Sequence, residues 1–330
     1  MNTNRRLMLS LPLALAASRL PVPSSAVAQT LQKNARILLG FPGGGAGDTI
    51  ARALAEKMRG VYAPQLIIEN RPGAGGRIAA DALKVSDPDG STFYQCPTSV
   101  MMIYPHVFKK TAYDPLRDFI PVTTSTTFQF SLTAGPGLPA EIRTLQQYIA
   151  WAKQNPKGAN YGSPSAGSMP HFAGVMLGRA AGVALNHAGY KGGAPLQQDL
   201  LGGHVPVGVH VVGEALANIA AGKLRSLATF GAQRNPFLPN VPTLVESGFS
   251  DLVFEEWVAY FVPARTPADT VNALHVSIRD ALKHQDVVNV MAKFGMTPRT
   301  DTPESLAKAL RTEHAKWGEI VKSTGFTSDD

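Results

Sequence analysis

The sequence contains a single cysteine, Cys96, among its 330 residues. An internal disulfide is therefore excluded, and no group of cysteines and histidines has the spacing of a zinc site. Lysines and arginines form no dense block, so nucleic acid is not an expected partner. Beyond the N-terminal segment, no stretch reaches the about 20 consecutive apolar residues that a membrane-spanning helix needs. The chain must be stabilised by ordinary hydrophobic cores.

The N-terminal segment has the pattern of a secretory signal. Arg5 and Arg6 precede the apolar stretch Leu7–Ala17, and Ala26-Val27-Ala28 has the small residues of a cleavage site. We interpret residues 1–28 as this signal, with Sec and twin-arginine export both open. Its removal takes away three arginines and lowers the formal net charge from +7 to +4. The mature protein is expected to be soluble and periplasmic.

The remaining chain alternates short apolar runs with helical patterns, which is typical of an α/β fold around a largely parallel sheet. Strands are predicted at 36–40, 66–69, 91–95, 159–162, 185–188, 205–211 and 224–229. Helices are predicted from Asp48 to Gly60, at 73–83, 100–108, 144–154, 171–181, 194–201 and 214–221, and after the caps Thr266 and Thr302. Asp48 is the expected N-cap of the first helix. About 300 residues with two similar units indicate two lobes with a cleft between them.

Two loops rich in small residues precede predicted helices. The first reads GFPGGGAGD from Gly40 to Asp48, and the second reads SPSAGS from Ser163 to Ser168. Unpaired amides at a helix start favour an anion, and glycines let a ligand come close. The first loop lacks the lysine of a P-loop, and Asp48 stands where a dinucleotide fingerprint needs its third glycine. A plain strand-to-helix turn remains the alternative.

The second loop also raises an enzyme hypothesis. Ser163-Pro164-Ser165-Ala166-Gly167 is close to the G-x-S-x-G elbow of serine hydrolases, but Ser163 replaces the first glycine. His171 and His187 are near in sequence. Only geometry can establish a Ser/His/Asp triad, so a hydrolase stays an alternative, although we do not expect an enzyme.

Several further stretches together resemble the Bug family, the periplasmic substrate-binding receptors of tripartite tricarboxylate transporters. The resemblance runs from about Ile37 to Gly325. It is carried by ENRPGAGG (69–76), AYDPLRDF (112–119), YKGGAP (190–195), DLLGGHV (199–205), AGKLRSLA (221–228) and PNVPTLVESG (239–248).

The resemblance implies a type II periplasmic-binding-protein fold, with two α/β lobes that close over one small carboxylated solute. It implies no catalysis, no cofactor and no metal. The expected lobes are residues 30–125 with 255–330, and residues 126–254. The expected partners are a carboxylate and the membrane subunits of a transporter, and the receptor is expected to be a monomer. Ligand sensing through a two-component kinase is the alternative role.

Carried onto this chain, the resemblance gives a carboxylate clamp with one cradle in each lobe. Backbone amides and hydroxyls at helix starts would hold the ligand without a fixed cation. The first cradle is Gly44, Gly45, Ala46, Gly47, Thr98 and Ser99. The second is Ser163, Ser165, Ala166, Gly167 and Ser168, with Tyr190 and Gly192 nearby.

His210 departs from the family pattern, which often has an aspartate suited to a ligand ammonium at this position. An imidazole can donate to a carboxylate or stack beside a ring, but it meets an ammonium poorly. We therefore predict a di- or tricarboxylate ligand, with an aromatic dicarboxylate as an option, and no amino acid. The alternative is a histidine satisfied within its own lobe.

Overall fold

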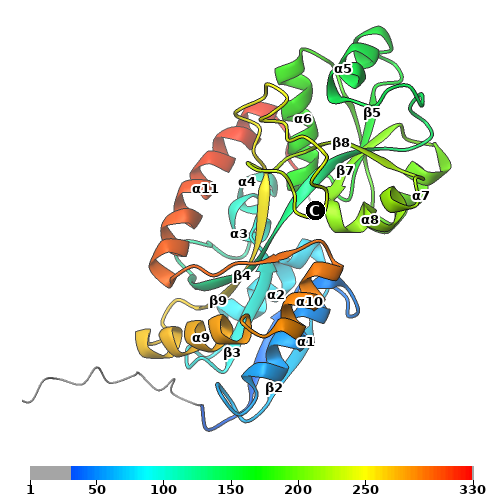
Figure 1. The fold of residues 1–330 in the computed structure, drawn as a ribbon. Coiled ribbons are helices and arrows are strands. Elements are labelled where there is room, and N and C mark those ends of the chain that lie inside the picture. The colour runs from blue at the N-terminus through cyan, green and yellow to red at the C-terminus, as the bar shows by residue number, and fades with distance from the viewer. Residues whose placement is uncertain (1–30, 329–330) are drawn as a thin grey trace, which may run out of the picture.

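The computed structural model describes residues 31–328. It has two α/β lobes, and the long strand β4 (Phe119–Ala134) runs from one into the other (Figure 1). The predicted signal, residues 1–28, lies outside the described residues. Between residues 31 and 328, no helix is long and apolar enough to cross a membrane.

The first lobe has a mixed sheet in the order β2-β1-β3-β9-β4, with β10 also pairing β4. Strands β1, β2 and β3 are parallel, and β9 and β4 are antiparallel to their neighbours. Its other strands are β1 (Ala35–Leu39), β2 (Leu66–Asn70), β3 (Thr92–Pro97), β9 (Glu255–Pro263) and β10 (Thr297–Pro298). The helices between them are α1 (Ala46–Met58), the 3₁₀ turn η1 (Ala74–Gly76), α2 (Arg77–Lys84), α3 (Ser99–Met102), α4 (Tyr104–Val107), α9 (Ala268–Ala281) and α10 (Gln285–Lys293).

The second lobe has a sheet in which β4 lies between β8 and the parallel strands β7, β5 and β6. Its strands are β5 (Asn160–Ser163), β6 (Asn186–Gly189), β7 (Val207–Val211) and β8 (Arg225–Thr229). Its helices are α5 (Leu145–Gln154), α6 (Met169–Ala181), α7 (Gly193–Gly202) and α8 (Val212–Ala220). A small apolar cluster under α7 and α8 includes Leu196, Leu200, Val205, Ala215 and Leu224.

The last helix, α11 (Pro303–Thr324), lies along β4 and contacts α3, α4 and α9 as well as α6 (Figure 1). Trp317 of α11 is buried and packs against Phe172 of α6 and Phe254. The C-terminal helix therefore contacts elements of both lobes.

Most predicted helices form where their caps and apolar periodicity place them. Thr144 and Gln147 make the capping box of α5, and Thr302 caps α11 through Ser305 N–H. Gly325 ends α11 in the left-handed conformation. Helix α9 begins one residue later than predicted, because Pro267 is its N-cap rather than its first residue.

Two predictions about the connections were wrong or incomplete. The helix expected at 100–108 is two short helices that meet at Ile103. Strands β4 and β9, which join the lobes, were not predicted. In β4, Thr123, Thr124, Ser125 and Thr126 are all fully buried, so the strand has no apolar/polar alternation there.

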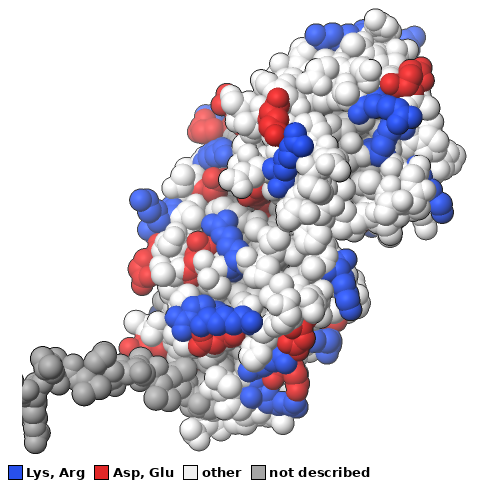
Figure 2. Space-filling view, viewed as in Figure 1, with Lys and Arg blue, Asp and Glu red and all other residues white. Residues whose placement is uncertain are grey.

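Charged side chains are mixed over both lobes. On the face shown in Figure 2, Lys and Arg side chains alternate with Asp and Glu side chains, and no field of one sign covers either lobe. An anionic ligand on this face would therefore depend on local donors rather than on a broad positive surface.

Candidate functional site

The carboxyl ends of the parallel strands in both lobes meet where β4 crosses between them. Gln129 pairs with Glu255 of β9, while the next residue, Phe130, pairs with Val211 at the end of β7. On the first-lobe side, Pro97 at the end of β3 pairs with Val258. The loops that follow these strands therefore face the junction of the lobes, which is where open α/β sheets bind ligands.

The start of helix α1 has unpaired backbone donors. Gly45 is the N-cap, and among the described residues no acceptor lies within hydrogen-bond range of the N–H groups of Gly45, Ala46 or Gly47. Gly43, Gly44, Gly45 and Gly47 are exposed. These amides can donate hydrogen bonds to a carboxylate at the positive end of the helix.

Asp48 is not the N-cap that the sequence predicted. It is the third residue of α1, and its carboxylate accepts the N–H of Gly44 at 3.0 Å. Arg52 donates to both carboxylate oxygens, at 2.9 and 3.0 Å, and Asn70 donates at 3.2 Å. The Arg52 hydrogen bonds are the main reason that the pKa of Asp48 is lowered. The buried carboxylate therefore fixes the shape of the loop and engages the Gly44 amide.

Thr98 and Ser99 follow β3 but offer fewer free donors than predicted. The Thr98 hydroxyl donates to Trp257 O at 3.1 Å, and Ser99 N–H donates to the Glu256 carboxylate at 2.9 Å. The Ser99 hydroxyl is buried and has no partner among residues 31–328. Burial raises the pKa of Glu256 to about 7. The Ser99 N–H is thus already bonded to a side chain of the protein and is not a free donor for a ligand.

Two stacked histidines are hydrogen-bonded to buried residues of the second loop. His171 and His187 have ring centroids 4.0 Å apart, and burial lowers the pKa of each to about 4. Gly167 N–H donates to His171 Nδ1 at 3.0 Å. In both loops a glycine of positive φ thus donates to the side chain four residues later, Gly44 to Asp48 and Gly167 to His171.

The exposed part of this loop carries free amides. Within the described chain, the N–H groups of Ser165 and Ala166 meet no acceptor, and both residues are exposed. The hydroxyl of Ser168 donates to Ser165 O at 2.6 Å, and that of Ser165 donates to Ala166 O at 3.2 Å. Ser165 and Ala166 are therefore the accessible donors among the residues predicted for the second cradle.

Ser163 and His187 form a close pair that does not make a hydrolase. The Ser163 hydroxyl lies 2.7 Å from His187 Nε2 and 3.0 Å from Ser165 O. Since the carbonyl can only accept, the hydroxyl donates to it and the imidazole donates to Ser163. Ser163 is fully buried, and none of the described carboxylates bonds to His187. The geometry therefore lacks both an exposed nucleophile and an oriented base.

Tyr190 and Gly192 also have partners in the same lobe. The Tyr190 hydroxyl donates to Asp199 at 2.8 Å, and burial together with this bond raises the pKa of Tyr190 to about 12. Gly192 N–H donates to Pro164 O at 2.8 Å. These contacts connect the start of α7 to the second loop.

His210 is 1% exposed and lies at the end of β7, opposite Ser131. Its Nδ1 is 3.6 Å from a carboxylate oxygen of Glu214, and its Nε2 is buried without a hydrogen-bond partner in the described chain. Glu214, four residues after His210, was not considered in the sequence interpretation. Since a carboxylate beside the imidazole can accept from an ammonium, the exclusion of amino acids stays a prediction.

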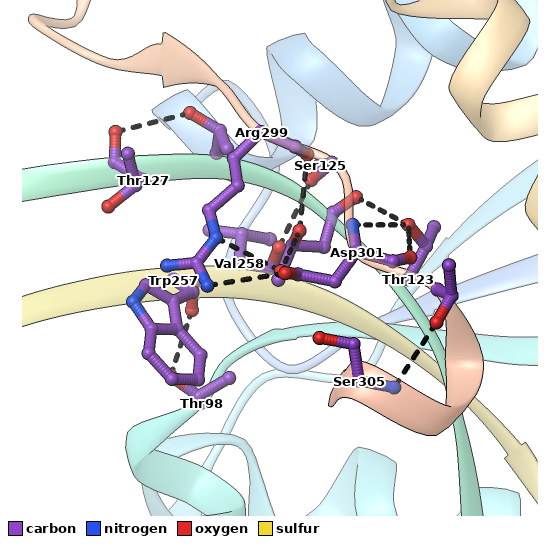
Figure 3. A network of polar contacts seen from close by, with 12 residues as sticks. Thr98, Thr123, Ser125, Thr127, Trp257, Val258, Arg299, Asp301 and Ser305 are labelled. Atoms are coloured by element: carbon purple, nitrogen blue, oxygen red, sulfur yellow. Dashed lines mark hydrogen bonds and ion pairs between the residues drawn. The ribbon is translucent and has the colours of Figure 1, made fainter. Parts of the chain in front are cut away.

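A polar network that the sequence did not reveal connects the two joining strands to the segment that precedes α11 (Figure 3). Arg299 donates to Asp301 at 3.0 Å, and its guanidinium lies 4.3 Å above the Trp257 ring. Thr123 and Thr124 donate to Asp301, each at 2.8 Å. The buried hydroxyls of Thr123 and Thr124 are therefore satisfied by a residue almost 180 positions away.

The described residues contain no cluster of histidine, cysteine or acidic side chains suited to a metal ion. The accessible hydrogen-bond donors of the two predicted cradles are the backbone N–H groups of Gly45, Ala46 and Gly47 and of Ser165 and Ala166. Their chemistry suits the binding of an organic anion.

Comparison with known proteins gives a consistent picture. The family model "Tripartite tricarboxylate transporter family receptor" matches residues 50–326. The chain is 30% identical to Protein BugT of Bordetella pertussis over 291 residues, which cover 88% of this chain and 89% of BugT.

Two solved structures of R. palustris proteins share the fold. "R. palustris Rpa4515 with adipate" superimposes with a TM-score of 0.79 at 27% identity, covering 89% of this chain and 98% of that one. MatC from Rhodopseudomonas palustris, with bound malate, gives a TM-score of 0.75 at 26% identity, covering 88% and 99%. The similarity spans both lobes, so the predicted periplasmic-binding-protein fold is confirmed.

Proposed function

Because this chain belongs to the family of tripartite tricarboxylate transporter receptors, we propose that it captures a small carboxylate in the periplasm and delivers it to the membrane subunits of such a transporter. The single observation that supports a carboxylate most strongly is the pair of free amide groups at the junction, Gly45–Gly47 in one lobe and Ser165 with Ala166 in the other. A dicarboxylate is our first choice, since adipate and malate occupy two structural neighbours, and an aromatic dicarboxylate is the second.

The clamp works through charge-assisted hydrogen bonds. A ligand carboxylate at the start of α1 meets amides that give up only bonds to water when they bind it, because none of residues 31–328 accepts from them. Asp48 and His171 keep the neighbouring loops in shape rather than touching the ligand. Among the predicted site residues, Gly44, Gly167 and Gly192 use their N–H groups to fix the shape of the loops and do not donate to the ligand.

Capture involves closure of the lobes around the ligand. Residues 30–125 with 255–330 would move relative to 126–254, with β4 and β9 as the flexible connections. A ligand that touches both loops stabilises the closed state, and this differential affinity drives the motion. In this proposal the receptor acts as a monomer, and residues 1–28 direct its export.

The test is calorimetric titration of the mature protein with aliphatic and aromatic dicarboxylates and with their uncharged diamides. We expect binding of at least one acid and none of its diamide. Binding of no acid, or of acid and diamide alike, would overturn the carboxylate clamp. Deleting the gene should abolish uptake of that acid, and unchanged uptake would contradict the transport role.

The substitution Ala46→Pro provides a matched structural test. Ala46 is the first residue of α1, where proline is well tolerated, and Gly45 before it has the extended backbone that proline requires. The change removes one N–H and should weaken binding about tenfold, which corresponds to about 1.4 kcal/mol. Ala268→Pro, at the first residue of the distant helix α9, is the control and should leave affinity unchanged.

A further inference from the structure

Glu214 differs from every other acidic side chain described around the junction of the lobes. It lies in the first turn of α8, immediately after β7, and its side chain is 39% exposed. Neither of its carboxylate oxygens accepts a hydrogen bond from residues 31–328. Asp48 and Glu256, by contrast, are buried and bonded to Gly44 and Ser99.

The position of the Glu214 carboxylate is defined by two elements of the second lobe. His210 Nδ1 lies 3.6 Å from one oxygen. The carboxylate also lies directly over Gly193, the first residue of α7, where a Cβ atom would come within 2.4 Å of both oxygens. Only glycine leaves room for this approach, and the positive end of α7 favours the negative charge there.

This position is next to the predicted second cradle. Gly192 N–H donates to Pro164 O, so the start of α7 is bonded to the loop that carries Ser165 and Ala166. Gly213, the residue before Glu214, packs against the backbone of Phe294 and Gly295 in the first lobe. Glu214 thus lies at the junction of the lobes, in the same lobe as the free N–H groups of Ser165 and Ala166. Its carboxylate is available there as a hydrogen-bond acceptor.

We propose that Glu214 is a specificity-determining residue that selects carboxylates carrying a hydroxyl or ammonium group. This inference rests on the proposed function, because the amides must hold the carboxylate. The Glu214 oxygens then accept from the donor on the same ligand, and they repel a second carboxylate placed at that point. His210, buried beside it, is a positioning residue that limits the side-chain conformations of Glu214.

A site that accepts a hydrogen bond from its ligand discriminates against a ligand that lacks the donor, since the acceptor is left unpaired in the complex. The test therefore compares acids that differ only by one substituent. The series are succinate, malate and aspartate; glutarate, 2-hydroxyglutarate and glutamate; and terephthalate with hydroxyterephthalate. Each is titrated calorimetrically into the mature wild-type protein, Glu214→Gln and the surface control Glu141→Gln.

We expect one hydroxyl- or amino-bearing acid to bind the wild type at least about tenfold more tightly than its parent, a difference worth about 1.4 kcal/mol. Glu214→Gln should remove most of this preference, keep or improve binding of the parent acid, and leave the thermal midpoint unchanged. Glu141→Gln should behave as the wild type. His210→Gln, which removes the imidazole beside Glu214, should reduce the preference without abolishing binding.

Equal affinity for parent and substituted acids in the wild type would overturn the inference while leaving the carboxylate clamp intact. A preference that survives in Glu214→Gln would overturn it as well. If no acid bound any of the proteins, the proposed function would fail, and this inference with it.

Discussion

The carboxylate of Asp48 accepts the backbone N–H of Gly44 at 3.0 Å, across the loop that opens helix α1. Asp48→Ala removes this acceptor, leaves the Arg52 guanidinium without its partner and removes one of the two acceptors of Asn70. We expect a loss of about 1–3 kcal/mol in the free energy of unfolding and weaker ligand binding, because the loop is no longer held. Denaturant titration and calorimetry measure the two effects.

Asp286→Asn is the control for Asp48. Asp286 forms an exposed ion pair with Lys57 at 2.7 Å, and its loss should change the free energy of unfolding much less than the loss of Asp48 does. Equal destabilisation by the two substitutions would contradict the structural role of Asp48.

His171 makes the second loop sensitive to acid. Its pKa in the folded protein is about 4, below the about 6.5 of an unfolded chain. The unfolded state therefore binds the extra proton first, and stability falls as the pH drops from about 6.5 to about 4. His171→Asn can keep an acceptor for Gly167 N–H without titrating there. It should reduce the acid-induced fall in the thermal midpoint, and an unchanged fall would show that His171 does not cause it.

Glu256 should have the opposite effect on the pH dependence of stability, because its pKa is raised rather than lowered. Its pKa in the folded protein is about 7, above the about 4.3 of an unfolded chain. Its contribution to stability is fully present below about pH 4.3 and is lost as the pH rises through about 7. Glu256→Gln keeps an oxygen for Ser99 N–H and should flatten the stability profile between pH 5 and pH 7, a range set by these two values. An unchanged profile in Glu256→Gln would show that Glu256 does not cause this pH dependence.

Asp301 connects the segment before α11 to β4. Asp301→Ala would leave the Arg299 guanidinium without its acceptor and would remove one of the two acceptors of the Thr124 hydroxyl, the other being Arg299 O, so we expect a loss of about 1–3 kcal/mol in the free energy of unfolding. Asp280→Ala, which breaks only exposed pairs with Arg279 and Lys283, should cost less than about 1 kcal/mol. Chemical denaturation distinguishes the two, and a smaller effect at position 301 would contradict the network.

Local signals in the sequence were sufficient for most helices and for the parallel strands. Thr302, Pro303 and Gly325 fixed the limits of α11, because cap residues act within one turn of the helix. Strand β4 could not be predicted in the same way. The hydroxyls of Thr123, Thr124 and Thr126 are satisfied by partners at positions 297 to 301, which only the folded chain brings close.

The sequence indicated which loops form the candidate site, but not which of their donors already have partners in the folded chain. The glycines before α1 and the small residues before α6 indicated free amides at helix starts, and the structure has them at Gly45–Gly47 and at Ser165 and Ala166. Glu214 could not be found from spacing alone. Its environment depends on Gly193, which comes from a different strand-helix unit.

The central claim is that one ligand carboxylate is held by free amides at the junction of the lobes. The most direct measurement is the change in backbone amide chemical shifts of ¹⁵N-labelled mature protein as the tightest-binding carboxylate is added. The account predicts the largest changes at Gly45, Ala46, Gly47, Ser165 and Ala166. Changes confined to other parts of the molecule, with these five amides unmoved at saturation, would contradict it.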